Sequence, residues 1–151
     1  MNELATILKD SKKFSRKNDL KLIERAYAFA VKAHEGQMRL SGDPFITHCI
    51  RVAEILTSLR LDSSTIAAGL LHDVIEDTSR TRAELEAEFG EEVARLVEGV
   101  TQIGRIKFHS REEHQAENIR KMLIAMAKDV RVILIKLADR LHNMQTLKYL
   151  P

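Results

Sequence analysis

Four side chains that lie far apart in the sequence have the types that bind a divalent transition metal: His48, His72, Asp73 and Asp139. Two imidazoles and two carboxylates form a mixed nitrogen and oxygen set, which suits Mn²⁺, Zn²⁺ or Fe²⁺ better than a calcium cage. An octahedral ion held by this set would keep two positions open for water or substrate. Spacing in the sequence does not prove that these residues meet, so a metal site and separate surface positions remain open alternatives.

The surroundings of Asp139 favour the metal site. Asp139 follows an apolar run at residues 132–138 that is interrupted only by Lys136, and His142 and Asn143 come at the next turn. Clustering several uncompensated carboxylates in an apolar setting costs several kcal/mol per buried ion, whereas a divalent cation removes that cost. An acid on so apolar a helix is therefore expected to face a cation.

A second pair of acids, Glu76 and Asp77, follows His72 and Asp73 by one helical turn. On a continuous helix, at about 100° per residue, all four side chains share one face. Both acids would lie in the last turn, where the helix dipole disfavours negative charge by about 0.3–1 kcal/mol each, so stability does not explain them. The alternative is a solvated acidic edge, the ordinary explanation of an arbitrary Glu-Asp pair.

The elements that must position these residues are helices. Apolar residues recur at three- and four-residue spacing along the chain, and no stretch combines β-branched alternation with a hairpin turn. The sequence therefore predicts an all-α fold, a compact multi-helix bundle. The predicted helices cover residues 19–34, 44–59, 62–78, 81–90, 91–102, 112–128 and 129–149, with a polar loop at 107–111.

Local signals support several of these boundaries. Asp43, either Asp62 or Ser63, and Thr81 are suitable N-cap residues for three of the helices. Ala68 and Gly69 precede the His-Asp pair by one turn, and side chains this small allow another element or a ligand to approach closely. We therefore expect the helix at 62–78 to contact a neighbour along that face.

The composition is that of one soluble, helix-rich domain spanning residues 1–151. Lys and Arg number 24 against 22 Asp and Glu, so the net charge of +2 gives no global field that would indicate DNA binding. The single cysteine, Cys49, excludes an intrachain disulfide framework, and no apolar stretch approaches the roughly 20 residues needed to span a bilayer. We therefore expect a cytoplasmic protein that is not inserted in a membrane.

The sequence around the candidate residues carries a more specific signal. It reads GQMR at 36–39, SGDPFITH at 41–48, LLHDVIEDT at 70–78 and IKLADRLHNM at 135–144. The order His, His-Asp, Asp resembles the HD superfamily of metal-dependent phosphohydrolases. The surrounding sequence resembles the N-terminal hydrolase domain of the RelA/SpoT family of (p)ppGpp synthetase/hydrolases, from about residue 18 over nearly the whole chain.

This resemblance implies a reaction and a role for each motif residue. The reaction is hydrolysis of the 3′-pyrophosphate of (p)ppGpp to GDP or GTP plus pyrophosphate, which ends the bacterial stringent response, with one Mn²⁺ per domain. The resemblance assigns the metal to His48, His72, Asp73 and Asp139, activation of water to Glu76 and Asp77, and nucleotide contacts to Arg39, Ser41, Asn143 and Thr146. It further implies an N-terminal fragment of a longer protein that has downstream synthetase and regulatory domains.

Two positions depart from the family pattern. Leu40 stands where a second basic residue is common, and Gln145 stands where arginine is common. Both changes remove positive charge near the expected substrate, so they bear on affinity and nucleotide preference.

Two alternative functions remain beside the leading one. They are an HD-type nucleotidase or phosphodiesterase acting on other nucleotides, and a regulatory domain that binds a nucleotide without hydrolysing it. The intact His72-Asp73 pair argues against the regulatory alternative, because family members that have lost the activity lack this pair.

Three further residues receive structural rather than catalytic expectations. His34 ends a predicted helix, where its charge favours a capping role. His142 adjoins the Asp139 face and is expected to support or pack against the metal ligands rather than to bind the metal. Cys49 is expected to point away from His48.

Overall fold

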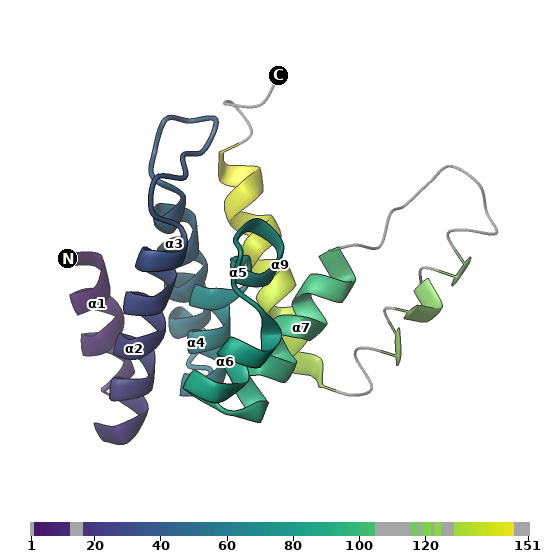
Figure 1. The fold of residues 1–151 in the computed structure, drawn as a ribbon, viewed down its shortest axis with the longest axis horizontal. Coiled ribbons are helices and arrows are strands. Elements are labelled where there is room, and N and C mark those ends of the chain that lie inside the picture. Colours follow the sequence, from purple (N-terminus) through teal and green to yellow (C-terminus); the bar gives the residue numbers. More distant parts are fainter. Residues whose placement is uncertain are drawn as a thin grey trace.

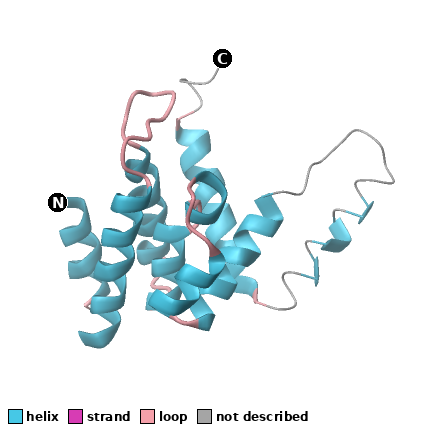
Figure 2. Ribbon diagram, in the orientation of Figure 1, coloured by secondary structure: helices cyan, strands magenta, loops and turns pink. Residues whose placement is uncertain are grey.

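The computed structural model describes residues 2–12, 17–104, 116–117, 119–121, 123–124 and 129–146. In this part of the chain every regular element is a helix, and the one β-type pairing is an isolated bridge between Met38 and Pro44. The helices are α1 Asn2–Ser11, α2 Lys17–Ala33, α3 Phe45–Ser58, α4 Ser63–Leu71, α5 Val74–Asp77, α6 Arg82–Phe89, α7 Glu91–Gly104 and α9 Val130–Gln145 (Figures 1 and 2). The expectation of an all-α bundle is confirmed.

Helix α4 forms the centre of the bundle. Its residues 65–71 are all buried, and it contacts α2, α3, α7 and α9. At Gly69 the approach of α3 is especially close, since a Cβ atom there would lie 2.5 Å from Leu56 Cδ1. The expected close contact along this face is therefore confirmed, and the neighbour is α3.

Two of the three predicted side-chain caps are present, at the starts of α4 and α6. The Asp62 carboxylate accepts from the Thr65 backbone N–H at 3.3 Å at the start of α4, and the Thr81 hydroxyl accepts from the Glu84 N–H at 3.3 Å at the start of α6. The cap predicted at Asp43 is wrong. Helix α3 begins at Phe45 without a side-chain cap, because the Asp43 carboxylate instead accepts from the Ser41 hydroxyl at 3.0 Å.

The continuous helix predicted over residues 62–78 is also wrong. Helix α4 ends at Leu71, Asp73 adopts φ −100° and ψ 0°, and the four-residue helix α5 begins after it. The His72 ring accounts for the break, because its Nδ1–H donates to the Gly69 carbonyl oxygen at 2.6 Å. A continuous helix would use that acceptor for the Asp73 N–H. The His-Asp pair and the two later acids therefore do not share the predicted helical face, and His72 and Asp73 lie at a corner.

Other boundaries differ by smaller amounts. Helix α1, which the sequence pattern did not indicate, packs against α2 and α3. Helix α9 begins after Asp129, whose carboxylate accepts from the Arg131 N–H at 3.0 Å. The predicted loop at 107–111, most of the predicted helix at 112–128 and residues 147–149 lie outside the described residues.

The predicted cap at His34 is replaced by a buried contact. His34 is 2% exposed, and its ring hydrogen-bonds the Gln37 side chain instead of the carbonyls at the end of α2.

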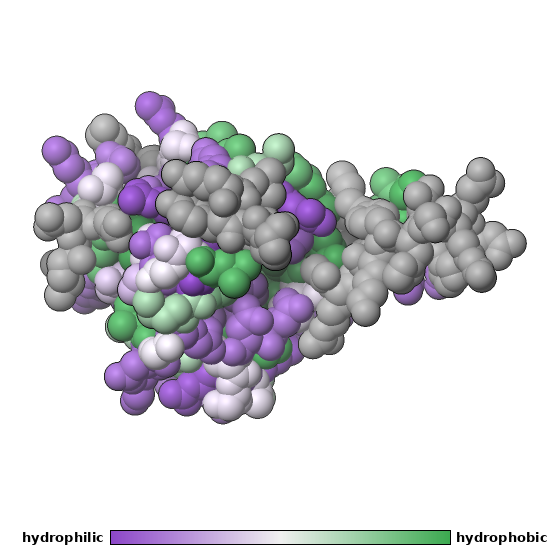
Figure 3. All heavy atoms as spheres, turned by 90° about the horizontal axis from the view of Figure 1, so that it is seen from above, coloured by the Kyte–Doolittle hydropathy of each residue, from purple (hydrophilic) through white to green (hydrophobic). Residues whose placement is uncertain are grey.

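No helix in the described ranges is long and apolar enough to cross a membrane. On the face drawn in Figure 3, hydrophilic residues surround smaller apolar areas. The apolar side chains that build the bundle are instead gathered in one core, to which α2, α3, α4, α7 and α9 all contribute.

Candidate metal centre

Three separate parts of the fold bring the four candidate ligands together. Helix α3 supplies His48, the corner between α4 and α5 supplies His72 and Asp73, and α9 supplies Asp139. One ligand atom from each residue lies within 4.8 Å of the others. His48, His72 and Asp139 are buried, and Asp73 is half-buried. The convergence that spacing alone left open is thus present in the structure.

The nitrogen atoms of both rings face the carboxylates. His48 Nε2 lies 2.7 Å from Asp139 Oδ1 and 3.8 Å from Asp73 Oδ2. His72 Nε2 lies 2.9 Å from Asp73 Oδ2 and 3.3 Å from Asp139 Oδ1. All four groups therefore point toward one common centre.

The charges inside the cluster favour ionised carboxylates and a positive partner beside them. Burial opposes protonation of His72, but Asp73 and Asp139 outweigh it and raise the pKa of His72 to about 10. Burial works against ionisation of Asp139, yet hydrogen bonds from His48 and His72 hold the pKa of Asp139 well below its usual range. His72 likewise lowers the pKa of Asp73 against the effect of burial. An imidazolium on His72 thus balances the acids, and a divalent cation can take over that charge.

The residues present fit a divalent transition metal. Metal bonds to histidine nitrogen or carboxylate oxygen are about 2.0–2.2 Å long, so ligand atoms on opposite sides of one ion lie about 4.2 Å apart. The cluster, with its ligand atoms within 4.8 Å, has this size. The ring orientation also fits, because the Nδ1–H of His72 is engaged by the Gly69 carbonyl and its Nε2 is the atom that faces the acids.

His142 performs the corresponding orientation for His48. The two Nδ1 atoms lie 2.7 Å apart, and the rings stack with centroids 4.9 Å apart. Burial and the nearby His48 and Arg39 lower the pKa of His142 to about 4, so its ring is neutral and its Nδ1 can accept. If Nε2 binds a metal instead of donating to Asp139, the proton of His48 must lie on Nδ1, where it can be donated to His142 Nδ1. The supporting role expected for His142 therefore agrees with the geometry.

Lys136 is a neighbour that the motif reasoning did not single out. Its Nζ lies 3.0 Å from Asp139 Oδ2, while Oδ1 faces the two imidazoles. The signal that could have found it is the i, i+3 spacing of Lys136 and Asp139 on one helix, which places such side chains side by side.

The two later acids lie beside the cluster without belonging to it. Glu76 and Asp77 are exposed side chains on α5. Partial burial and the negative charges of Asp73 and Glu76 raise the pKa of Asp77. Both acids still follow Asp73 closely along the chain, on the short helix after the corner. They do not share a continuous helical face with His72 and Asp73.

Two of the four expected nucleotide residues contact the surroundings of the cluster. The half-buried Arg39 reaches across to α9, where its guanidinium donates to Asn143 Oδ1 at 2.9 Å and lies 3.3 Å from His142 Nδ1. Asn143 in turn donates to Asp139 Oδ1 at 3.4 Å. Arg39 is therefore connected to the His-Asp cluster through two residues of α9.

The other two expected nucleotide residues make local hydrogen bonds. The Ser41 hydroxyl donates to Asp43 within the loop before α3. The Thr146 hydroxyl donates to the His142 and Asn143 carbonyl oxygens at the end of α9. The structure places both near the ends of elements that carry ligands, but not in contact with the ligands through these bonds.

Cys49 is excluded as a reactive group. It is fully buried, and burial together with the charges of Asp73 and Asp139 raises the pKa of its thiol well above the ordinary value. The protonated thiol is neither a nucleophile nor a metal ligand.

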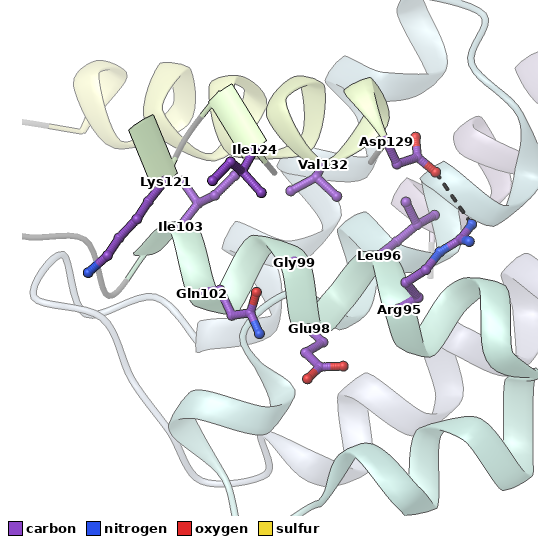
Figure 4. Close-up of a pocket in the computed structure, with 10 residues that line it drawn as sticks. All are labelled: Arg95, Leu96, Glu98, Gly99, Gln102, Ile103, Lys121, Ile124, Asp129 and Val132. Carbon is purple, nitrogen blue, oxygen red and sulfur yellow. Dashed lines mark ion pairs between the residues drawn. The ribbon is translucent and has the colours of Figure 1, made fainter. Parts of the chain in front are cut away.

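A cavity of about 510 Å³ lies away from this cluster, between α7, the start of α9 and residues 121 and 124. Figure 4 shows Val132 and Ile124 near one another at this cavity, and an ion pair between Arg95 and Asp129, at 3.5 Å, at its edge. None of its lining residues belongs to the His-Asp cluster. The cavity is therefore separate from the candidate metal centre.

Comparison with known proteins identifies one domain family and several similar proteins. Residues 26–151 match the HD domain family. A GTP pyrophosphokinase of Myxococcus xanthus is 54% identical over 135 residues, which is 87% of this chain and 18% of that protein. The bifunctional (p)ppGpp synthase/hydrolase SpoT of Escherichia coli K12 is 55% identical over 130 residues, 86% of this chain and 18% of that protein. A probable guanosine-3′,5′-bis(diphosphate) 3′-pyrophosphohydrolase of Synechocystis is 57% identical over 126 residues, 83% of this chain and 17% of that protein.

A solved structure agrees with these relatives. It is the structure of a metazoan ortholog of SpoT, described as hydrolysing ppGpp and as playing a role in starvation responses. It superimposes with a TM-score of 0.67 at 33% sequence identity, covering 84% of this chain and 70% of that chain. The curated relatives are much longer proteins, since this chain spans only 17–18% of the length of those named above.

Proposed function

The chain belongs to the HD domain family and is homologous to the (p)ppGpp hydrolase domain of the RelA/SpoT proteins, and from that premise we propose that it removes the 3′-pyrophosphate of (p)ppGpp. Water and ppGpp or pppGpp are converted to GDP or GTP and pyrophosphate. The observation that carries the proposal is the convergence of His48, His72, Asp73 and Asp139 in a chain that is 55% identical to SpoT over 130 residues.

The His-Asp cluster would hold one divalent ion, and we propose Mn²⁺. Its mixed nitrogen and oxygen donors suit that ion, and Gly69 and His142 orient the two imidazoles so that Nε2 of each faces the centre. When bound, such an ion supplies Lewis acidity, which lowers the pKa of a coordinated water toward neutrality.

Glu76 and Asp77 would act as the general base. Their carboxylates are exposed to solvent on α5, directly after the corner that carries Asp73. Because its pKa is raised, Asp77 binds a proton more strongly than an ordinary aspartate, which suits a group that accepts the proton of attacking water.

Arg39 would bind the nucleotide together with Ser41, Asn143 and Thr146. A guanidinium pairs with phosphate oxygens through a planar fork of donors, and Arg39 carries this charge next to Asn143 and the ligand-bearing helix α9. The roles of Ser41 and Thr146 rest on the resemblance of their motifs. Leu40, which is 71% exposed, offers no charge at this place, so we expect the nucleotide to be bound through fewer cationic contacts than in relatives with a second basic residue.

The test is pyrophosphate release by the purified 151-residue chain. Metal-free protein is assayed with ppGpp and pppGpp, with and without added Mn²⁺, and with Asp73→Ala as the matched control. We expect GDP or GTP and pyrophosphate in equal amounts, only with metal and only with the unaltered chain. Hydrolysis of GTP or deoxynucleotides instead of ppGpp would support a general nucleotidase. Binding of ppGpp without product would support a regulatory domain.

Two wider features belong to the same proposal. Because the curated relatives are more than five times as long as their matched region, we propose that downstream synthetase and regulatory domains accompany this domain in the full protein. We also propose a cytoplasmic setting, since a nucleotide substrate and one buried, unpaired cysteine suit a reducing compartment.

A further inference from the structure

Gln37, in the segment between α2 and α3, connects three parts of the fold. Its backbone N–H donates to the His34 carbonyl at 3.0 Å, and its own carbonyl accepts from the Phe45 N–H at 2.9 Å. Its side-chain Nε2 donates to the Asp77 carbonyl oxygen at 2.7 Å, and its Oε1 lies 2.9 Å from His34 Nδ1. Gln37 is therefore joined to the end of α2, the first residue of α3 and the last residue of α5.

The orientation of the Gln37 amide follows from its two partners. A backbone carbonyl can only accept, so Nε2 must be the atom that faces Asp77, and Oε1 then faces His34. His34 must carry its proton on Nδ1 to donate to Oε1. Its ring is 2% exposed and lies with its centroid 4.8 Å from that of Phe45, so packing holds the donor in place.

The tautomer also explains an otherwise unpaired atom. His34 Nε2 is buried and has no hydrogen-bond partner within the described part of the chain. With the proton on Nδ1, this atom is an acceptor lacking a donor instead of a buried N–H lacking an acceptor.

The contact with the Asp77 carbonyl lies at the end of α5, where backbone carbonyl groups lack partners within the helix. A helix leaves its last carbonyl groups without internal partners, and α5 has only four residues. Its own ladder consists of bonds such as Asp77 N–H to Asp73 O at 2.9 Å and Thr78 N–H to Val74 O at 3.2 Å. The Gln37 amide satisfies the Asp77 carbonyl from outside and links it to α3, which carries His48 one turn after Phe45.

We propose that Gln37 is a positioning residue that holds the end of α5, and with it the Asp77 carboxylate, at a set place beside the His-Asp cluster. His34 acts through Gln37 by fixing the amide. The kinetic consequence rests on the proposed function, since it requires that Asp77 serve hydrolysis. The structural consequence, that α5 loosens without Gln37, does not depend on any substrate.

Two substitutions separate the bonds of Gln37. Gln37→Leu has similar volume and removes both side-chain bonds. Gln37→Glu keeps an acceptor for His34 but cannot donate to the Asp77 carbonyl. Gln102→Leu is the matched control, since Gln102 is an exposed glutamine on α7, away from the cluster.

The first measurement is hydrogen exchange of the Asp77 and Thr78 amides in the 151-residue chain without nucleotide. We expect exchange about fivefold faster in both Gln37 variants, the scale of one lost hydrogen bond, and no change in the Gln102 control. Unchanged exchange at these amides would overturn the inference, whatever the activity of the variants.

The second measurement is turnover of ppGpp. We expect kcat to fall about tenfold in both Gln37 variants, as for a small misplacement of a reacting group, with KM and Mn²⁺ content unchanged. Because Gln37 acts through Asp77, adding Gln37→Leu to an Asp77→Asn chain should change kcat less than twofold. A tenfold loss in both backgrounds, or loss of metal, would refute the positioning role.

The two measurements also separate this inference from the proposed function. If the unaltered chain released no pyrophosphate while exchange still rose only in the Gln37 variants, the proposed substrate would be wrong and the placement of α5 by Gln37 would stand. If the chain hydrolysed ppGpp and the exchange of α5 did not respond, the proposed function would stand and the role of Gln37 would fall.

Discussion

Gly69→Ala tests how closely the metal centre depends on the packing of α3 against α4. An added Cβ would lie 2.5 Å from Leu56 Cδ1 and 3.6 Å from Val52 Cγ1. Carbon atoms pack at about 3.5–4.0 Å, so relief requires a movement of about 1 Å by the buried Leu56 side chain or by the helix. Overpacking of this kind costs about 1–3 kcal/mol, and alanine recovers about 1 kcal/mol of helix propensity. We expect a net loss of about 1 kcal/mol and a melting temperature lower by about 2–4 °C.

The same movement should reach the ligands. Helix α3 carries His48, and α4 leads into His72 and Asp73, so separating the two helices separates the imidazoles. We expect Mn²⁺ affinity to fall about tenfold or more, the usual scale for disturbing the groups that orient metal ligands. Thermal unfolding of the metal-free chain and Mn²⁺ titration by calorimetry measure the two effects separately.

Leu56→Val provides the compensating change, because valine lacks the δ carbon that the new methyl group would meet. Alone, it should cost about 1 kcal/mol through lost burial. Combined with Gly69→Ala, it should restore metal affinity, so the two effects are not additive. Unaltered melting and metal binding in Gly69→Ala, or failure of Leu56→Val to restore affinity, would show that the α3–α4 contact does not set the ligand geometry.

The remaining predictions concern the ligands, the base, the nucleotide and acid stability. Asp73→Ala should remove metal and turnover together; a variant with full metal content and turnover would contradict its assignment as a ligand. Glu76→Gln with Asp77→Asn should retain Mn²⁺ and ppGpp binding while single-turnover pyrophosphate release falls about 10²-fold, and undiminished release would leave the pair a solvated edge. Arg39→Ala should raise the Kd for ppGpp with little change in melting temperature. A large drop in melting temperature with an unchanged Kd would show that Arg39 is structural. Hydrogen bonds from Arg131 lower the pKa of Asp129. The ionised carboxylate therefore adds to the free energy of unfolding above about pH 4, and this contribution is lost as the pH falls through the lowered pKa. Asp129→Asn should therefore flatten the loss of unfolding free energy in acid, measured by urea titration from pH 5 to pH 2.

The helices and their caps follow from local chemistry. A stripe of apolar residues with a period of 3.6 must be buried on one side, and this requirement depends only on neighbours along the chain. Asp62 and Thr81 cap the helices that follow them because their side-chain oxygens reach backbone N–H groups three residues later. The types of the metal-site residues are likewise visible in the sequence, since few other side chains bind a divalent ion.

The corner at His72 could not be derived from periodicity. Apolar residues recur at helical spacing from Ile66 to Ile75, on both sides of His72 and Asp73, so the pattern favours one helix. The His72 ring nevertheless takes the Gly69 carbonyl that the helix would use, and it can do so because Asp73 and Asp139 bind its other nitrogen. The same ring thus also contacts α9, through residues 67 positions apart, and no periodicity in the sequence reports such a contact.

The sequence by itself determined the all-helical class, most helix boundaries and the set of side chain types suited to a divalent metal. The tertiary structure alone decided that His48, His72, Asp73 and Asp139 share one centre, that Arg39 reaches Asn143 from 104 residues away, and that Gln37 holds the end of α5. The physical reason is range. Helix formation is governed by bonds between residues three or four apart, whereas the site consists of bonds between helices whose relative placement depends on how the whole core packs.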